Sequence, residues 1–164
     1  MATRSFIGYY EDNKIVGVYC HYDGSISHNG KILCQYYNSI NKIKELVKLG
    51  SLSCLEKNIY PTEEHSFNKP QDNVTIAYHR DRGDDDITIH NFSSLKQLKN
   101  YIDSSYLDNV YIFYLEEWYY IYNINKNNIT FMKVEDMIYR QNNNMKEPIN
   151  VITIYNLFIG DNIK

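Results

Sequence analysis

A chain of 164 residues with 43% hydrophobic content is long enough to bury one core, so we expect a single domain over residues 1–164. Its 17 basic and 20 acidic residues give a formal net charge of -3, which argues against a nucleic-acid-binding protein. No apolar run approaches the roughly 18 residues that a membrane span needs, so we expect no membrane partner.

The cysteines and the amino-terminal segment indicate the cellular compartment. Cys20, Cys34 and Cys54 form no regular disulfide framework, and the segment MATRSFIGYYEDNK lacks the long apolar region of a secretion signal. We therefore expect a cytoplasmic protein in a reducing environment.

The first predicted element is a hairpin with strands at residues 3–10 and 14–22. Asp12-Asn13 lies between them and can adopt the positive φ angles of a tight turn. This turn predicts a register in which Glu11 pairs with Lys14.

The predicted register separates the side chains of the hairpin onto two faces. The face that carries Cys20 is the more uniformly apolar, so we expect it to pack on the core. On the opposite face, Gly8 and Gly17 are expected to leave space beside four side chains: Arg4, Tyr19, His21 and Asp23.

The middle of the chain predicts helices and a second hairpin. Apolar residues at helical spacing over 31–50 indicate one long helix or two short ones. Residues 55–73 contain two prolines and many polar groups, and we expect an irregular connection there. Strands at 74–80 and 85–90 are expected to pair across a turn at Asp81–Asp84.

The second half completes the predicted fold. Ser93 or Ser94 can cap its first helix. The expected elements are this helix to about residue 104, a three-stranded meander over 109–134 with turns at Glu116-Glu117 and 125–128, a short helix near 134–141 and a last strand at 150–158. The sequence thus predicts an α+β domain with a mainly antiparallel sheet, an N-terminal hairpin, two to four helices and a Tyr-rich C-terminal meander.

Histidine and cysteine side chains can serve as metal ligands or as catalytic groups. No Cys-x-x-Cys pair occurs, and Cys20 and His21 point to opposite faces of a strand, so we predict neither a metal site nor a Cys–His nucleophile. His21 and Asp23 share one face, where they could form an acid–base pair or a structural hydrogen-bonded pair. We expect no cofactor.

The segment YHRDRGDDD at residues 78–86 is a candidate phosphate-binding turn. Arg80 and Arg82 carry planar, permanently charged forks that suit phosphate, and Gly83 lets a ligand approach the backbone. The three following aspartates could instead neutralise both arginines, which would give an ordinary solvated turn. The mixed charge fits a small ligand with phosphate and hydroxyl groups better than a polyanion.

The aromatic meander offers a second type of contact. Its Trp118 and neighbouring tyrosines could stack on a purine ring, or they could form the core on one side of the sheet and an interface on the other. We expect a homo-oligomer, because the meander offers an apolar surface that a second subunit could bury.

Four segments carry a resemblance to a known family: ATRSFIG at residues 2–8, YCHYDG at 19–24, LVKLGSLSCL at 46–55 and HRDRGDDD at 79–86. Together they resemble small accessory proteins encoded by phages, prophages and related elements. That family has a tryptophan where this chain has Tyr22, and its Arg-Asp-Arg-Gly motif matches residues 80–83. The resemblance covers about residues 2–95.

The resemblance implies an anti-defence protein that acts in the host cell. One class of such proteins sequesters nucleotide immune signals, such as the cyclic ADP-ribose isomers made by TIR-domain enzymes of Thoeris defence. By analogy with that class, we expect the chain to bind such an adenine nucleotide without catalysis. The expected ligand-binding residues are Arg4, Tyr19, His21, Asp23, Gly24, Arg80, Arg82, Gly83 and Trp118.

Two other functions stay open at this point. An enzyme that cleaves the signal would use His21 or Asp23 as acid or base. A protein inhibitor of a host defence enzyme would instead use an exposed Tyr/Trp surface. Ligand binding as expected requires that the N-terminal hairpin and the turn at residues 80–84 form one pocket.

Overall fold

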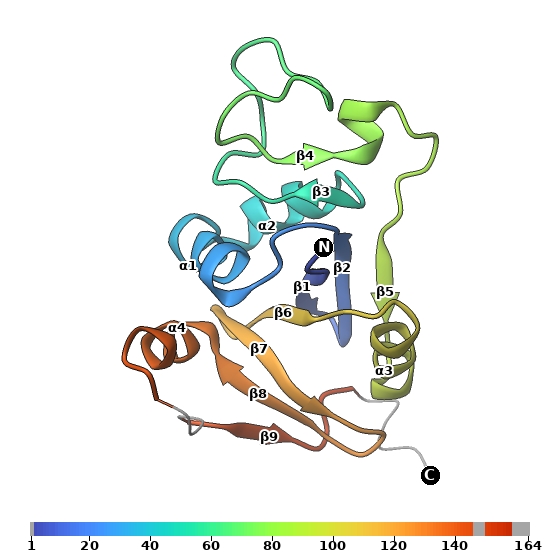
Figure 1. The fold of residues 1–164 in the computed structure, drawn as a ribbon. Coiled ribbons are helices and arrows are strands. Elements are labelled where there is room, and N and C mark those ends of the chain that lie inside the picture. The colour runs from blue at the N-terminus through green and yellow to red at the C-terminus, as the bar shows by residue number, and fades with distance from the viewer. Residues whose placement is uncertain (1, 146–149, 159–164) are drawn as a thin grey trace.

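The computed structural model describes residues 2–145 and 150–158, and it shows one mixed sheet with helices on both faces (Figure 1). The nine strands are β1 (Ser5–Glu11), β2 (Lys14–Cys20), β3 (Leu52–Cys54), β4 (Ile76–Ala77), β5 (His90–Phe92), β6 (Asn109–Tyr114), β7 (Glu117–Ile124), β8 (Ile129–Lys133) and β9 (Ile152–Ile154). Their order is β4-β3-β2-β1-β6-β7-β8-β9, and β5 pairs with β2 outside this path.

Four α-helices and two π-helical turns accompany the sheet. They are α1 (Lys31–Tyr36), α2 (Ile40–Val47), α3 (Leu95–Ser104), α4 (Val134–Asn142) and the turns at Ile26–Gly30 and Tyr78–Arg82. Most strand pairs are antiparallel, whereas β1 is parallel to β6 and β2 to β3. The predicted α+β fold with a mainly antiparallel sheet is confirmed. Among the described residues, no helix is long and apolar enough to cross a membrane.

The N-terminal hairpin has the predicted turn and register. Asp12 and Asn13 adopt φ angles of 52° and 63°, and Glu11 pairs with Lys14. The pairing continues to Phe6 opposite Tyr19. A two-residue turn with positive φ angles matches the right-handed twist of the strands, which explains why local sequence was sufficient here.

Both faces of the hairpin are buried, which corrects the expectation of a single core face. Cys20 is fully buried with α1 and α2 on one face, as predicted. On the other face Phe6 is also fully buried, and it packs with Phe92 of β5 and Leu98 of α3. The glycines leave no empty space, because a Cβ on Gly17 would lie 2.5 Å from the Phe6 ring.

The predicted second hairpin at residues 74–90 is wrong. β4 contains only two residues and pairs with β3, and the chain then tightens into the π-helical turn at Tyr78–Arg82. The physical reason is local: the Asp81 side chain accepts a hydrogen bond from the Ala77 amide at 2.8 Å, which draws the chain back on itself. From this turn the chain runs alongside the sheet to β5, which pairs with β2 (Figure 1).

The remaining elements follow the sequence prediction, with shifted ends. The helical pattern at 31–50 gives two short helices, and Ser94 caps α3 by accepting a hydrogen bond from the Gln97 amide. The first meander turn lies one residue earlier than predicted, at Leu115-Glu116. The last strand, β9, is shorter than the predicted strand at 150–158.

Gly17→Ala tests the close packing of the hairpin. The added Cβ would lie 2.4 Å from the Ile7 carbonyl oxygen, and overpacking of this kind costs roughly 1–3 kcal/mol. Urea denaturation should show that loss in the free energy of unfolding. Gly83→Asn is the control, because its Cβ would meet no atom within 4 Å and asparagine tolerates positive φ. Equal stability of Gly17→Ala and the wild type would contradict this account.

Candidate functional site

An open cleft of about 670 Å³ lies between the hairpin and the turn at Tyr78–Arg82. Tyr19 of β2 forms one wall, Tyr78 and Arg82 form another, and the backbone of Gly83 borders them. Three consecutive aspartates at residues 84–86 complete the rim. The cleft therefore brings the N-terminal hairpin and the predicted phosphate-binding turn together, with Tyr19, Arg82 and Gly83 in one site.

Arg82 is held by two aromatic rings and one carboxylate. Its guanidinium carbon lies 4.3 Å from the centroid of the Tyr78 ring and 5.0 Å from that of Phe67. Nε and Nη2 donate to the two carboxylate oxygens of Asp84 at 2.8 and 2.7 Å. These hydrogen bonds raise the pKa of Arg82 and lower the pKa of Asp84. The guanidinium is thus fixed in orientation while it stays at the surface.

Gly83 gives a ligand access to the backbone of this turn. It adopts a φ of 86°, which favours glycine, and no atom lies within 4 Å of the position that a Cβ would take. The main chain beside Arg82 is therefore open at this residue, and the contact of a ligand with Gly83 stays a prediction.

Tyr19 connects the cleft to His21 and Arg4. The Tyr19 hydroxyl lies 2.6 Å from Nδ1 of His21. Burial raises the pKa of Tyr19, and the Arg4 guanidinium opposes that effect by hydrogen bonding to the phenol. Burial also raises the pKa of Tyr78. Both phenols at the cleft are therefore protonated near neutral pH.

The Arg80 guanidinium binds other groups of the protein, although Arg82, only two residues away, faces the cleft. It donates to both oxygens of Asp81 at 2.8 and 3.0 Å, and to the carbonyl oxygens of Ile59 and Thr75, each at 2.7 Å. Four hydrogen bonds to the protein leave little of the guanidinium for a ligand. Arg80 was predicted to bind the ligand. In the structure its guanidinium instead holds the turn to its neighbours.

Asp81 is the acceptor at the centre of this turn, with a side chain that is 3% exposed. Besides Arg80 and the Ala77 amide, it contacts Nε2 of buried His65 at 3.2 Å, a close approach without the alignment of a good hydrogen bond. Nδ1 of His65 accepts from the Gln71 amide. Burial alone would raise the pKa of Asp81, but the hydrogen bonds from Arg80 and Ala77 lower it below its usual value.

Asp23 and Gly24 lie at the turn after β2, outside the residues that line the cleft. The His21 side chain contacts the Tyr19 hydroxyl and packs edge-on against the Tyr22 ring, and no hydrogen bond to Asp23 is seen within the described part of the chain. Gly24 is buried: its amide donates to the Thr3 carbonyl, and its own carbonyl accepts from the Tyr111 hydroxyl at 2.6 Å. The backbone amide and carbonyl of Gly24 are thus bound by protein groups, and its predicted contact with a ligand has no support from this geometry.

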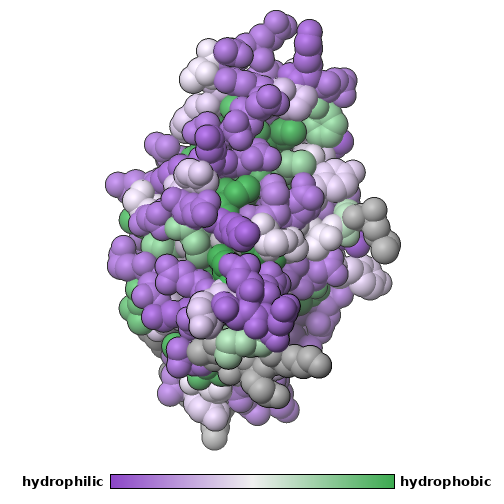
Figure 2. Space-filling model, turned by 60° about the vertical axis from the view of Figure 1, so that its left-hand side comes forward, coloured by the Kyte–Doolittle hydropathy of each residue, from purple (hydrophilic) through white to green (hydrophobic). Residues whose placement is uncertain are grey.

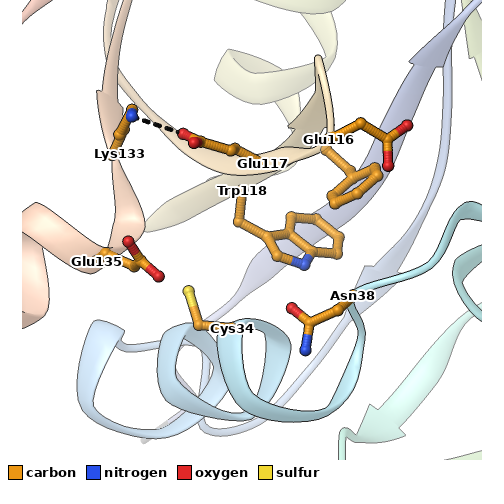
Figure 3. Close-up of a pocket in the computed structure, with 8 residues that line it drawn as sticks. Cys34, Asn38, Glu116, Glu117, Trp118, Lys133 and Glu135 are labelled. Carbon is orange, nitrogen blue, oxygen red and sulfur yellow. Dashed lines mark ion pairs between the residues drawn. The ribbon is translucent and has the colours of Figure 1, made fainter.

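Trp118 belongs to the opposite face of the sheet, where it packs 5.3 Å from Phe113. Its indole Nε1 donates to the Tyr37 carbonyl at 2.8 Å, and only 4% of the residue is exposed. Figure 3 shows it beside a separate cavity of about 240 Å³ near α1, with Cys34 and Asn38 below the ring. The expectation that Trp118 shares the pocket of Tyr19 and Arg82 is corrected, since it lies in the core of the other face.

The described residues give no evidence for a metal site or for a reactive thiol at Cys20 or Cys34. Within residues 2–145 and 150–158, no group of three or more histidine, cysteine or acidic side chains could hold a metal ion. Burial raises the pKa of both Cys20 and Cys34 to about 12, so these thiols are protonated at neutral pH.

Sequence reasoning missed three residues that contact Arg82. Tyr78 was expected to be an ordinary strand residue, and Asp84 was considered only as a possible neutralising charge. Phe67 lies in the irregular connection, where no periodicity marks it, yet its amide donates to the Asp81 carbonyl and its ring covers Arg82. The sequence signal for Tyr78 and Asp84 was their position beside two arginines and a glycine.

No family model, curated protein or solved structure matches this chain. The resemblance of its motifs to a phage accessory family therefore stays a prediction, and the functional argument depends on the cleft itself.

Asp81→Asn should destabilise the fold, because it leaves Arg80 and His65 without their charged partner. Breaking a largely buried pair costs roughly 2–4 kcal/mol, which urea denaturation at neutral pH would measure. Because the folded-state pKa of Asp81 lies below the ordinary aspartate value of 3.8, its stabilising effect is present above that pH and declines as pH falls below it. The two proteins should thus converge in stability under acid conditions. A constant difference down to pH 2 would contradict the role of the ionised carboxylate.

Proposed function

We propose that this chain binds a small adenine nucleotide, of the cyclic ADP-ribose class of immune signals, and sequesters it without reaction. The observation that carries the proposal is the cleft in which the stacked Arg82 guanidinium lies beside Tyr19 and Tyr78. Guanidinium groups bind phosphate, aromatic rings stack on bases, and the aspartates of the rim can accept hydrogen bonds from ribose hydroxyls.

The size and chemistry of the cleft support a small ligand. A volume of about 670 Å³ falls in the range of ordinary small-molecule sites. The acidic residues at 84–86 add negative charge at the rim, which disfavours a long polyanion such as duplex DNA. A ligand with few phosphates and several hydroxyl groups suits this mixture.

The geometry favours binding over turnover. The Tyr19 phenol is protonated, and its partner His21 contacts that phenol instead of forming the acid–base pair with Asp23. The fixed donors of the cleft are suited to holding a ligand. In a host cell, such binding would lower the free concentration of the signal.

A homo-oligomer is a further part of the proposal. β9 lies at the end of the sheet order, and apolar side chains in it and directly beside it are exposed, with Val151 42%, Ile152 40% and Tyr155 62% exposed. Figure 2 shows a mostly hydrophilic surface with small, separate hydrophobic groups on the face that it displays. Sedimentation at high protein concentration should therefore show a dimer or larger assembly, and a monomer throughout would contradict this part.

The direct test of the function is release of bound ligand. The protein is incubated with cyclic ADP-ribose isomers and related adenine nucleotides, separated from free ligand, denatured and analysed by mass spectrometry. Intact nucleotide in stoichiometric amount is expected. Altered nucleotide would indicate an enzyme, and absence of any bound nucleotide would overturn the proposal and favour a protein inhibitor.

Arg82→Ala and Arg80→Ala should separate binding from folding. Loss of a charge-assisted contact to phosphate should weaken nucleotide binding by roughly ten- to hundredfold in Arg82→Ala, with little change in melting temperature. Arg80→Ala should instead lower the melting temperature, because it removes two hydrogen bonds to Asp81 of the turn and one each to the carbonyls of Ile59 and Thr75. Calorimetry with wild-type affinity for Arg82→Ala would show that this residue does not bind the phosphate.

A further inference from the structure

The pair formed by Arg82 and Asp84 has the geometry of an occupied anion site. The carboxylate presents two oxygens to two nitrogens of the guanidinium, at 2.8 and 2.7 Å. A phosphate group can offer the same two oxygens to the same fork, because guanidinium binds both anions in a planar bidentate arrangement. Asp84 thus lies where a ligand phosphate would bind Arg82.

Two rings hold the guanidinium in place independently of Asp84. The guanidinium carbon lies over the Tyr78 ring at 4.3 Å and over the Phe67 ring at 5.0 Å, and neither contact involves the carboxylate that binds Nε and Nη2. Removal of the carboxylate would therefore leave both ring contacts to Arg82 in place. Such preorganisation reduces the entropic cost of binding.

The carboxylate of Asp84 can leave without moving the main chain. The backbone of this residue is held separately, since its amide donates to the Tyr78 carbonyl at 3.2 Å and its carbonyl lies 2.6 Å from Nδ1 of His79. The side chains of Arg82 and Asp84 are 48% and 38% exposed. Ion pairs with this exposure are weak and exchange readily with solutes. The buried pair of Arg80 and Asp81 has no such freedom.

We propose that Asp84 is an internal substitute for a ligand phosphate, and that the phosphate or pyrophosphate of a bound nucleotide displaces it from Arg82. The inference rests on the proposed function for the identity of the ligand. It assigns Asp84 a competitive role: the residue keeps Arg82 paired in the free protein and lowers its affinity for phosphate.

Asp84→Asn provides the test, with Asp85→Asn as the matched control. Each variant removes one negative charge from the rim of the same cleft, but only the first removes the carboxylate that binds Arg82. The probe is inorganic pyrophosphate, titrated into the full chain by calorimetry at low ionic strength. Asp84→Asn should bind it roughly three- to fivefold more tightly than Asp85→Asn, because only this variant removes the competing ion pair.

The outcomes separate this inference from the proposed function. Equal affinity of the two variants would overturn the inference, because the gain would then be due to net charge alone. Weaker binding by Asp84→Asn, or no pyrophosphate binding by any of the proteins, would overturn it as well. If Asp84→Asn gains affinity for pyrophosphate while no adenine nucleotide binds, the anion site is supported and the proposed nucleotide function fails.

Discussion

The carboxylate of Asp81 is the interaction on which the candidate site depends. It accepts hydrogen bonds from the Ala77 amide and from Arg80, and it contacts buried His65. These contacts come from the strand before the turn, from the turn itself and from the long connection, so one buried charge joins three segments. A buried carboxylate is stabilising only when such partners compensate for its lost hydration. Here they do, and the turn that results fixes the direction in which Arg82 leaves the main chain.

The two arginines of the turn show how neighbouring residues acquire different roles. Arg80 points into the protein and forms hydrogen bonds to carbonyl groups, whereas Arg82 lies on Tyr78 and faces the cleft. The first arginine makes the turn rigid, and the second offers its charge at the surface. A rigid support is what a small binding site needs, because affinity depends on groups that are already oriented before the ligand arrives.

Local sequence was sufficient for the hairpin, for the Ser94 cap and for the meander, because turn residues and alternation determine them. It failed where distant segments decide the structure. The second hairpin was wrong because Asp81 closes a tight turn, and Trp118 was misplaced because aromatic spacing does not reveal which face of a sheet a side chain joins. A pocket between the hairpin and the turn was predicted from Arg4 and Arg82; Tyr19 and Arg82 line the cleft, whereas Arg4 is outside its lining. The contact of the Phe67 ring with Arg82 could not be predicted, since Phe67 lies in an irregular segment.

The central claim is that a nucleotide binds beside Arg82 on one face of the sheet, away from the single tryptophan. A titration of the isotope-labelled protein with a cyclic ADP-ribose isomer, followed by amide and indole NMR signals, tests it most directly. The account predicts that the Gly83 amide signal moves with ligand concentration while the Trp118 indole signal, whose donor is bound to the Tyr37 carbonyl, stays in place. Movement of the indole signal with an unchanged Gly83 signal would contradict the account.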